Sequence, residues 1–447
     1  MKKEKNSKES LFKAALSIFQ RDIFVYFLSI LTGVIVARKL GPEMLGIWVV
    51  MALIPSYAEA FGRLKTDIAS VYVIGKGHAR PEEALFSMNI FALLTSTIIV
   101  LLLLWQIDFI NEFFSQSASD NYKEALIIII LFIPFEFLML NYGYFNIAHE
   151  NTVVYNNIKV IKGITNFLVV AFFLLVLDFK IWALVFARSL SIVLPLIYAF
   201  LNLDRSNWIP LRSRWNSTLS IELLRYAFNF YVIGIISHIH ELSIKTISAI
   251  YLSSSELAFY SQGEAASKML NRVPESLRLI LYPRISGLKH SQEAIEISCQ
   301  SFRLTFLVLI ICGIILFIIA KPLIVFLYGD IFEPTSEVLI IAIPGIIIGG
   351  SCLVIKSYFE GIGKADLIAK IQAIPVIIQI ILAYLFLNIW GLMGAAIAFS
   401  IGFSLFGLSI FVVFLIETRI SIFKMIPNLE DVKTLYLSIF PVKNETI

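Results

Sequence analysis

The chain has 447 residues, of which 58% are hydrophobic and only 15% are charged, and its net charge is +4. Soluble domains carry about 25% charged residues, so this composition excludes an ordinary soluble protein and indicates an all-helical membrane protein. We expect about twelve helices of bilayer-spanning length, at residues 12–37, 44–62, 84–105, 124–147, 152–177, 181–202, 221–251, 256–283, 297–320, 334–357, 365–388 and 392–416. Charges interrupt the second and eighth of them, among them Glu59, Glu264, Lys268 and Arg272.

The sequence lacks the signatures of a cleaved leader, a disulfide framework or a nucleotide site. No small-residue cleavage site closes the first apolar run, so we expect a retained first helix. Cys299, Cys312 and Cys352 lie in or beside apolar runs without paired spacing, which predicts neither disulfides nor a metal site. No glycine loop followed by Lys-Ser or Lys-Thr is present, so we do not expect this chain to hydrolyse ATP.

The basic residues predict how the chain is oriented. If the helices alternate in direction, the Lys-rich N-terminus and the basic connections after the second, sixth and eighth helices lie on one side. The connections after the third and ninth helices are acidic and lie on the other side. Because basic connections stay in the cytoplasm, both termini are predicted to be cytoplasmic. The short connection that carries Arg38 and Lys39 is an exception.

The two halves of the chain resemble each other weakly. Matching residues recur at nearly one spacing: Leu40, Leu45 and Trp48 with Leu252, Leu257 and Tyr260, Tyr144 with Tyr358, and Ala183 with Gly394. This repeat predicts two six-helix bundles related by an axis along the membrane normal, an arrangement in which transporters hold their site between the halves. We place the first bundle at residues 1–205, the second at 206–420 and a cytoplasmic tail at 421–447.

Four positive charges lie inside segments that must cross the membrane: Lys159, Lys162, Arg188 and Lys245. A charge at the bilayer centre costs at least about 2.5–3.5 kcal/mol, so such residues usually face a polar cavity and are functional. Several cations with few obvious partners predict a cavity for an anion. The alternative is that they snorkel to the membrane surface. We favour snorkelling for Lys159, leave it open for Lys162, and favour the cavity for Arg188 and Lys245.

Three acidic residues also lie within the predicted helices: Glu59, Glu136 and Glu241. A buried carboxylate can carry a proton in an ion-coupled transporter, or it can neutralise a neighbouring cation, and both readings stay open. Glu241 is four residues from Lys245, so the two could pair on a helix. His238 and His240 are two residues apart and face different ways, so we expect no shared metal ion.

The first connection contains Arg38, the turn residues Gly41, Pro42 and Glu43, and then Gly46. Proline lacks an amide donor and restricts the residue before it, so one helix ends here. Glu43 then lies near the start of the next helix, where a negative charge is favoured. On these grounds alone, the segment is an ordinary short turn. It also resembles the first-loop signature of the bacterial polysaccharide biosynthesis transporters, the Wzx-type O-antigen and capsule repeat-unit flippases of the multidrug/oligosaccharidyl-lipid/polysaccharide exporter superfamily.

Three segments of the second half add to this resemblance. Leu327–Gly329, followed by Phe332, resembles the family's segment after its ninth helix, and Gly361–Lys364 resembles the turn before its eleventh. Trp390–Ala396 resembles the start of its twelfth helix. The resemblance covers nearly the whole chain in helix count, length and loop order. It departs at Ser253–Ser255, which stand where the half-repeat would place Gly-Pro-Glu.

The resemblance implies a flippase that moves an undecaprenyl-pyrophosphate-linked oligosaccharide repeat unit to the periplasmic face of the bacterial inner membrane, for O-antigen, lipopolysaccharide or capsule. It implies two six-helix bundles around a central cavity that opens alternately to each face. The cations suit this substrate, because Arg and Lys make charge-assisted hydrogen bonds to a pyrophosphate. We expect no enzyme activity, no nucleic acid and no cofactor apart from coupling to H⁺ or Na⁺. The expected partners are the lipid bilayer, a polysaccharide polymerase and chain-length proteins.

Three alternatives stay open. A multidrug exporter of the same superfamily would prefer cationic drugs and an excess of cavity carboxylates, whereas the deep charges here lean positive. A membrane-embedded polymerase or ligase would need a large periplasmic loop with catalytic residues, and the outer connections here are short. A peptidoglycan-precursor flippase usually has two more helices than we expect.

Overall fold

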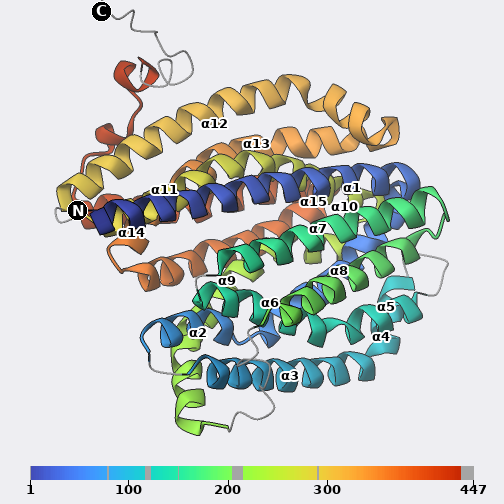
Figure 1. Cartoon of the computed structure of the whole chain (residues 1–447). Helices are drawn as coiled ribbons and strands as arrows, with labels where there is room; N and C mark the ends of the chain where they lie inside the picture. The colour runs from blue at the N-terminus through green and yellow to red at the C-terminus, as the bar shows by residue number, and fades with distance from the viewer. Residues whose placement is uncertain are drawn as a thin grey trace, which may run out of the picture. The chain divides into compact units, whose positions relative to one another are not determined.

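A computed structural model describes residues 2–77, 80–115, 122–149, 151–203, 215–288 and 291–433 of the chain (Figure 1). All regular elements in these ranges are helices. Nine helices within them are long and apolar enough to cross a membrane. The predicted class, an all-helical integral membrane protein, is therefore confirmed.

Two of the long helices each combine two membrane-length segments across a glycine. In α1 (Lys2–Gly62) the break is at Gly41, with a φ of 73°, and in α15 (Ala365–Thr418) it is at Gly391, with a φ of 54°. Glycine has no Cβ, so it adopts positive φ without the steric cost that other residues meet. A further, less apolar segment consists of α10 (Ser254–Ser267), η2 (Lys268–Asn271) and α11 (Arg272–Ser286). Together the described elements provide the predicted set of about twelve membrane-length segments.

The chain divides into two compact units. Unit 1 comprises Met1–Leu242 and Ser253–Ala258, and unit 2 comprises Ser243–Leu252 and Phe259–Ile447. Besides α1 and the start of α10, unit 1 contains α2 (Thr66–Gly75), α3 (Pro81–Trp105), α4 (Ile107–Ser115), α5 (Lys123–Leu131), α6 (Ile133–Ala148), α7 (Thr152–Leu175), α8 (Ile181–Leu201) and most of α9 (Ser217–Tyr251). Besides α11 and α15, unit 2 contains α12 (Ser291–Tyr328), η3 (Asp330–Phe332), α13 (Pro334–Leu353), α14 (Lys356–Gly361) and η4 (Ile422–Met425). The predicted bundle boundary at residues 205 and 206 lies outside the described residues and stays a prediction.

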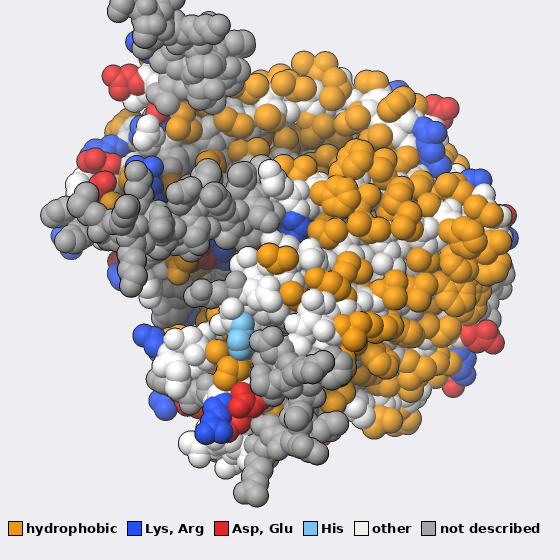
Figure 2. Space-filling view, in the orientation of Figure 1, with side chains coloured by type: hydrophobic (Ala, Val, Ile, Leu, Met, Phe, Trp, Pro, Cys, Tyr) orange, Lys and Arg blue, Asp and Glu red, His pale blue; other side chains and the backbone are white. Residues whose placement is uncertain are grey.

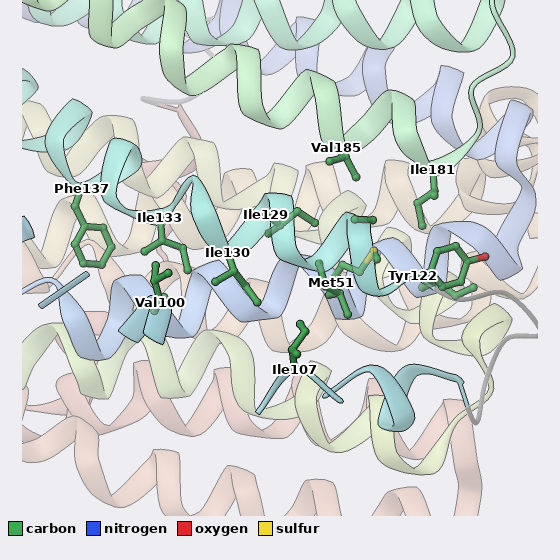
Figure 3. Packing of buried hydrophobic residues seen from close by; sticks show 14 of the residues in the cluster. Met51, Val100, Ile107, Tyr122, Ile129, Ile130, Ile133, Phe137, Ile181 and Val185 are labelled. Carbon is green, nitrogen blue, oxygen red and sulfur yellow. The ribbon is translucent and has the colours of Figure 1, made fainter. Parts of the chain in front are cut away.

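The core of unit 1 is packed around α5 and α6. Ile129, Ile130, Ile133 and Phe137 are at most 2% exposed, and they pack with residues of α1, α3 and α8 such as Met51 (Figure 3). In a membrane this packing is stabilised by van der Waals contact more than by the hydrophobic effect, because lipid is as apolar as these side chains. The contacts fix the start of α6, which carries Glu136.

In unit 2, helices α13 and α15 approach each other through small residues. An ideal Cβ at Gly345 would lie 2.4 Å from the carbonyl oxygen of Ser400, and one at Gly349 would lie 2.4 Å from that of Phe403. The Gly345 amide donates a hydrogen bond of 3.0 Å to the Ser400 hydroxyl. The two glycines are four residues apart, a spacing that lets membrane helices pack closely.

Large apolar side chains stay exposed on the membrane-length helices. On α3, Leu94, Ile98, Leu101 and Trp105 are between 57% and 78% exposed. Figure 2 shows hydrophobic side chains over a broad area of one face of the molecule. In water such a surface would mark an association site. On helices of this length it is the surface that lipid covers.

The motif of the first connection forms the break in α1. Gly41 has the positive φ, and Pro42 follows it directly. An ideal Cβ at Gly46 would lie only 1.8 Å from the backbone oxygen of Ser254, so the helix after the break runs directly against the start of α10. Arg38 and Glu43 are exposed. The two glycines therefore have structural roles that are visible in the fold.

The segment after α15 is attached to α12 by one arginine. Arg303 donates hydrogen bonds of 2.7 and 3.1 Å to the Asp431 carboxylate and one of 2.7 Å to the Lys424 carbonyl. Burial by itself would raise the pKa of the Asp431 carboxyl, but the hydrogen bonds from Arg303 outweigh it and lower the pKa below its ordinary value. Met425 is 3% exposed and packs into the core of unit 2. The start of the predicted tail is therefore a docked segment.

Replacing Gly46 with Ala should destabilise the protein, because the new methyl group would overlap the Ser254 backbone. Overpacking of this kind costs about 1–3 kcal/mol. The measurement is the thermal unfolding midpoint in detergent. Gly33→Ala is the matched control, because it lies on the same helix and a Cβ there would meet no atom within 4 Å. Equal midpoints for the two variants would contradict the close contact.

Replacing Asp431 with Asn should release the docked segment, because charged hydrogen bonds worth about 1.5–3 kcal/mol are weakened. Backbone hydrogen exchange over residues 422–433 should become faster. The lowered pKa of Asp431 means that its stabilising contribution is present above the ordinary value and is lost as the pH falls through the lowered value. Wild-type protein should therefore exchange like the variant only in strong acid. Glu293→Gln, which removes the same charge at an exposed residue of α12, should leave exchange of this segment unchanged.

Candidate functional site

Unit 1 holds a buried carboxylate between two cations. Glu136 on α6 accepts a hydrogen bond of 2.5 Å from Arg188 on α8. Its other carboxylate oxygen lies 3.4 Å from the ammonium group of Lys162 on α7. These three residues form the Glu136 centre. The structure thus brings together three of the residues that the sequence identified.

Each member of the Glu136 centre is positioned by its own helix. Pro134 stands at the start of α6, where the missing amide hydrogen is no loss. Glu136 follows in the first turn, where the helix dipole favours a negative charge. Lys162 is followed by Gly163, whose lack of a side chain allows α7 to pack against α1. Arg188 lies in the middle of α8, so its charge needs a partner at that depth.

Exposure within the Glu136 centre increases from the carboxylate to the cations. The side chain of Glu136 is 11% exposed, that of Arg188 is 23% exposed and that of Lys162 is 41% exposed. One negative and two positive charges give the centre a net charge of about +1. Both cations can therefore reach an incoming anion from the more exposed side, while the carboxylate lies behind them.

A second pair of cations lies close to one tyrosine ring. The Lys159 ammonium is 4.9 Å and the Arg21 guanidinium is 5.4 Å from the centre of the Tyr155 ring. Arg21 is buried and donates hydrogen bonds to Asn156 and Asp22, whereas Lys159 is exposed. Arg21 was missed in the sequence, although it lies inside the predicted helix 12–37. The rule that identified Lys162 would have identified it as well.

Unit 2 holds a second buried carboxylate between two cations. Glu264 on α10 lies 2.8 Å from the ammonium of Lys245 on α9 and 2.7 Å from that of Lys268 in η2. The side chain of Glu264 is 2% exposed, while those of Lys245 and Lys268 are 21% and 28% exposed. Lys268 also lies 5.8 Å from the centre of the Phe399 ring. These three charged residues form the Glu264 centre.

The sequence identified Lys245 but not this partner. It placed Glu241 four residues away as a candidate, whereas Glu264 and Lys268 were interpreted only as charges that interrupt an apolar pattern. The sequence does contain a feature that indicates this centre. Glu264 and Lys268 are four residues apart, a spacing at which opposite charges pair on a helix, and they form such an ion pair. Glu241 is exposed.

Glu59 belongs to a break between α1 and α2. Arg63 donates one hydrogen bond of 2.8 Å to Glu59 and another to Asp67, so it ties together the two sides of the break. Lys65 within the break has a φ of 58° and lies 3.9 Å from Glu59. A non-glycine residue in this region is held there by its surroundings. Glu59 is therefore a counter-charge at a helix break in unit 1.

The described residues include no group of three or more His, Cys, Asp or Glu side chains that could hold a metal ion. His238 lies close enough to Glu59 and Lys65 to interact with their charges. What the Glu136 and Glu264 centres offer chemically is pairs of partly exposed cations, which bind anions through charge-assisted hydrogen bonds.

Comparison with known sequences identifies the family. A family model described as "Polysaccharide biosynthesis protein" matches residues 35–337. A "Putative O-antigen transporter" of Shigella flexneri is 22% identical over 375 residues, which cover 82% of this chain and 88% of that protein. Both findings agree with the resemblance in the motifs around Gly41 and in the second half.

Solved structures share the fold. A structure titled "Lipid II flippase MurJ, inward closed conformation" has a TM-score of 0.75 at 16% identity and covers 95% of this chain and 93% of its own. An inward-facing multidrug resistance MATE family transporter of the MOP superfamily has a TM-score of 0.71 at 14% identity and covers 91% and 98%. The MATE transporter VcmN of Vibrio cholerae in its bent form has a TM-score of 0.61 at 14% identity and covers 93% and 98%.

These relatives are described as transporters and a flippase, so the expectation of a transporter and not an enzyme is confirmed. The chain is a multi-pass membrane protein. Because the family model covers more than half of the sequence, the chain belongs to the polysaccharide biosynthesis protein family, as a membrane transporter of the flippase or exporter class.

Proposed function

We propose that the protein flips an undecaprenyl-pyrophosphate-linked oligosaccharide repeat unit from the cytoplasmic to the periplasmic face of the bacterial inner membrane by alternating access. The observation that carries this proposal is that each unit holds two partly exposed cations beside one buried carboxylate, at Glu136 and at Glu264. The family match and the O-antigen transporter relative support a saccharide substrate.

The chemistry of the centres suits a pyrophosphate. Its charge is concentrated on a few oxygens, and a guanidinium such as that of Arg188 can donate two parallel hydrogen bonds to them. Lys162, Lys245 and Lys268 add point charges on flexible stems that can follow a moving group. The polyprenyl tail can stay in the lipid, because its transfer into protein would gain little.

The proposal also covers the orientation of the chain in the membrane and the coupling of transport to an ion gradient. We place both termini in the cytoplasm, from the basic connections, and we expect the protein to work with a polysaccharide polymerase and chain-length proteins. Coupling to H⁺ or Na⁺ would need a carboxylate that exchanges the ion during the cycle. Glu59, Glu136 and Glu241 are the candidates for this role; Glu59 and Glu136 each have two cationic partners.

Multidrug export is the second candidate function, and the shared fold with MATE family transporters favours it. A site for cationic drugs should carry excess negative charge. The Glu136 and Glu264 centres each carry excess positive charge, which would repel such compounds. We therefore rank the lipid-linked anion above the drug.

Replacing Arg188, Lys245 and Lys162 with Ala, singly and together, should reduce surface polysaccharide. Each substitution removes a cation that binds the headgroup, and loss of a charged hydrogen bond typically costs about 1.5–3 kcal/mol, or about tenfold to a hundredfold in binding. Surface polysaccharide and the amount of protein in the membrane are measured in a deletion host. Lys364→Ala, which removes an exposed cation paired with Glu417, is the control. Normal export by the triple variant would rule out the cationic site.

Deletion of the gene in its host tests the flippase function directly. Complete lipid-linked repeat units should accumulate on the cytoplasmic face of inner-membrane vesicles of known sidedness, while surface polysaccharide is lost. Analysis of the accumulated lipid would also identify the sugars. Normal delivery of complete units to the periplasmic face would exclude flipping and make drug export the leading hypothesis.

A further inference from the structure

We propose that Glu136 and Glu264 are internal counter-anions that limit how tightly the two centres hold a phosphate-bearing headgroup, and thereby allow its release. This inference rests on the proposed function, because it assigns a role to the carboxylates at the same centres. The two glutamates are positioning residues in this scheme, acting on the headgroup through the cations.

Among the described residues, both units contain the same arrangement of charge and depth. In the Glu136 centre the carboxylate is 11% exposed and its cations are 23% and 41% exposed. In the Glu264 centre the carboxylate is 2% exposed and its cations are 21% and 28% exposed. Elements from different parts of the chain build the two centres, yet both place the anion deepest. This order leaves the cations open to a second anion.

Among the described residues, the side-chain partners of the two carboxylates are these cations. Glu136 is held by Arg188 and Lys162, and Glu264 by Lys245 and Lys268. The nearby Tyr260 hydroxyl is buried and makes no hydrogen bond among the described residues, so it does not take over part of this task. When a cation turns toward a phosphate, the carboxylate behind it is left buried and less compensated. That cost favours return of the cation and release of the phosphate.

The magnitude of this effect is large enough to control affinity. At a separation of about 6 Å and an effective dielectric constant of about 20, one unit charge changes the affinity for another by about a hundredfold. Solvent screening reduces this figure, so we expect each carboxylate to weaken phosphate binding by at least about tenfold. Without the carboxylates, each centre would hold a headgroup with two uncompensated cations, and the transporter would release it slowly.

The test measures binding and transport separately on the full chain. Binding of inorganic pyrophosphate to protein in lipid nanodiscs is measured by calorimetry for wild type, Glu136→Gln and Glu264→Gln. Transport is measured as surface polysaccharide in the deletion host. We expect at least about tenfold tighter pyrophosphate binding together with less surface polysaccharide. Glu333→Gln, which neutralises a carboxylate paired with the exposed Lys321, should change neither quantity.

A second pair of variants keeps the test decisive if a single glutamine variant folds poorly. Glu136→Gln combined with Lys162→Gln keeps the net charge of the centre at the wild-type value of about +1, so the carboxylate is removed without adding net charge. The double variant should bind pyrophosphate at least about tenfold more tightly than Lys162→Gln alone, because Arg188 is then freed from its counter-anion. Equal binding by these two variants would overturn the proposal.

The remaining outcomes separate this inference from the proposed function. If wild type binds pyrophosphate and the glutamine variants bind it equally or more weakly, the counter-anion role is wrong while the cationic headgroup site stands. If binding is unchanged but transport loses its dependence on an ion gradient, the carboxylate is a coupling group and the inference is also wrong. If neither wild type nor any glutamine variant binds pyrophosphate, the headgroup site and the counter-anion role both fail.

Discussion

The constraint on which this structure depends is that a charge placed inside a membrane must meet an opposite charge or water. Every deep carboxylate of the two centres meets two cations, and each centre keeps one positive charge in excess. Two local features of unit 1 serve that pairing: Pro134 stands at the start of α6, and Gly163 lets α7 pack close to α1. A membrane helix that carries an arginine at mid-length is tolerable only because a neighbour supplies the partner at the same depth.

The fold followed from the sequence to a large extent, because composition and helix length are local properties. Apolar runs predict helices wherever a bilayer is the solvent, and the breaks at Gly41 and Gly391 coincide with residues that accept positive φ. The end of α1 at Gly62 also coincides with the predicted end of the second helix at residue 62. Arg63 holds this break through hydrogen bonds to Glu59 and Asp67. Each partner is four residues from Arg63, a spacing that also pairs side chains along an unbroken helix, so these residues give no sign of the break.

The sequence predicts that the site contains cations within the membrane, but it identifies only some of the residues that form it. A cation in an apolar segment can be read from the chain, which is why Lys162, Arg188 and Lys245 were identified. The partner of such a cation depends on tertiary packing: Glu136 and Arg188 are 52 positions apart and meet only when α6 and α8 pack. From the sequence, Glu241 was the expected partner of Lys245, because it is only four residues away. The structure instead pairs Lys245 with Glu264, which lies beyond the turn between α9 and α10. Arg21 lies inside the first predicted helix, so the rule that identified Lys162 applies to it as well.

The contact between Gly46 and Ser254 has a consequence for how relatives of this protein diverge. Position 46 requires glycine, because even the methyl group of alanine would overlap the backbone of Ser254. On the other side of the contact the touching atoms belong to the main chain of Ser254, which every amino acid shares. This contact therefore restricts the residue type at position 46 and places almost no restriction on the residue type at position 254. A search for distant homologues should weight the glycine heavily and give its opposite position almost no weight.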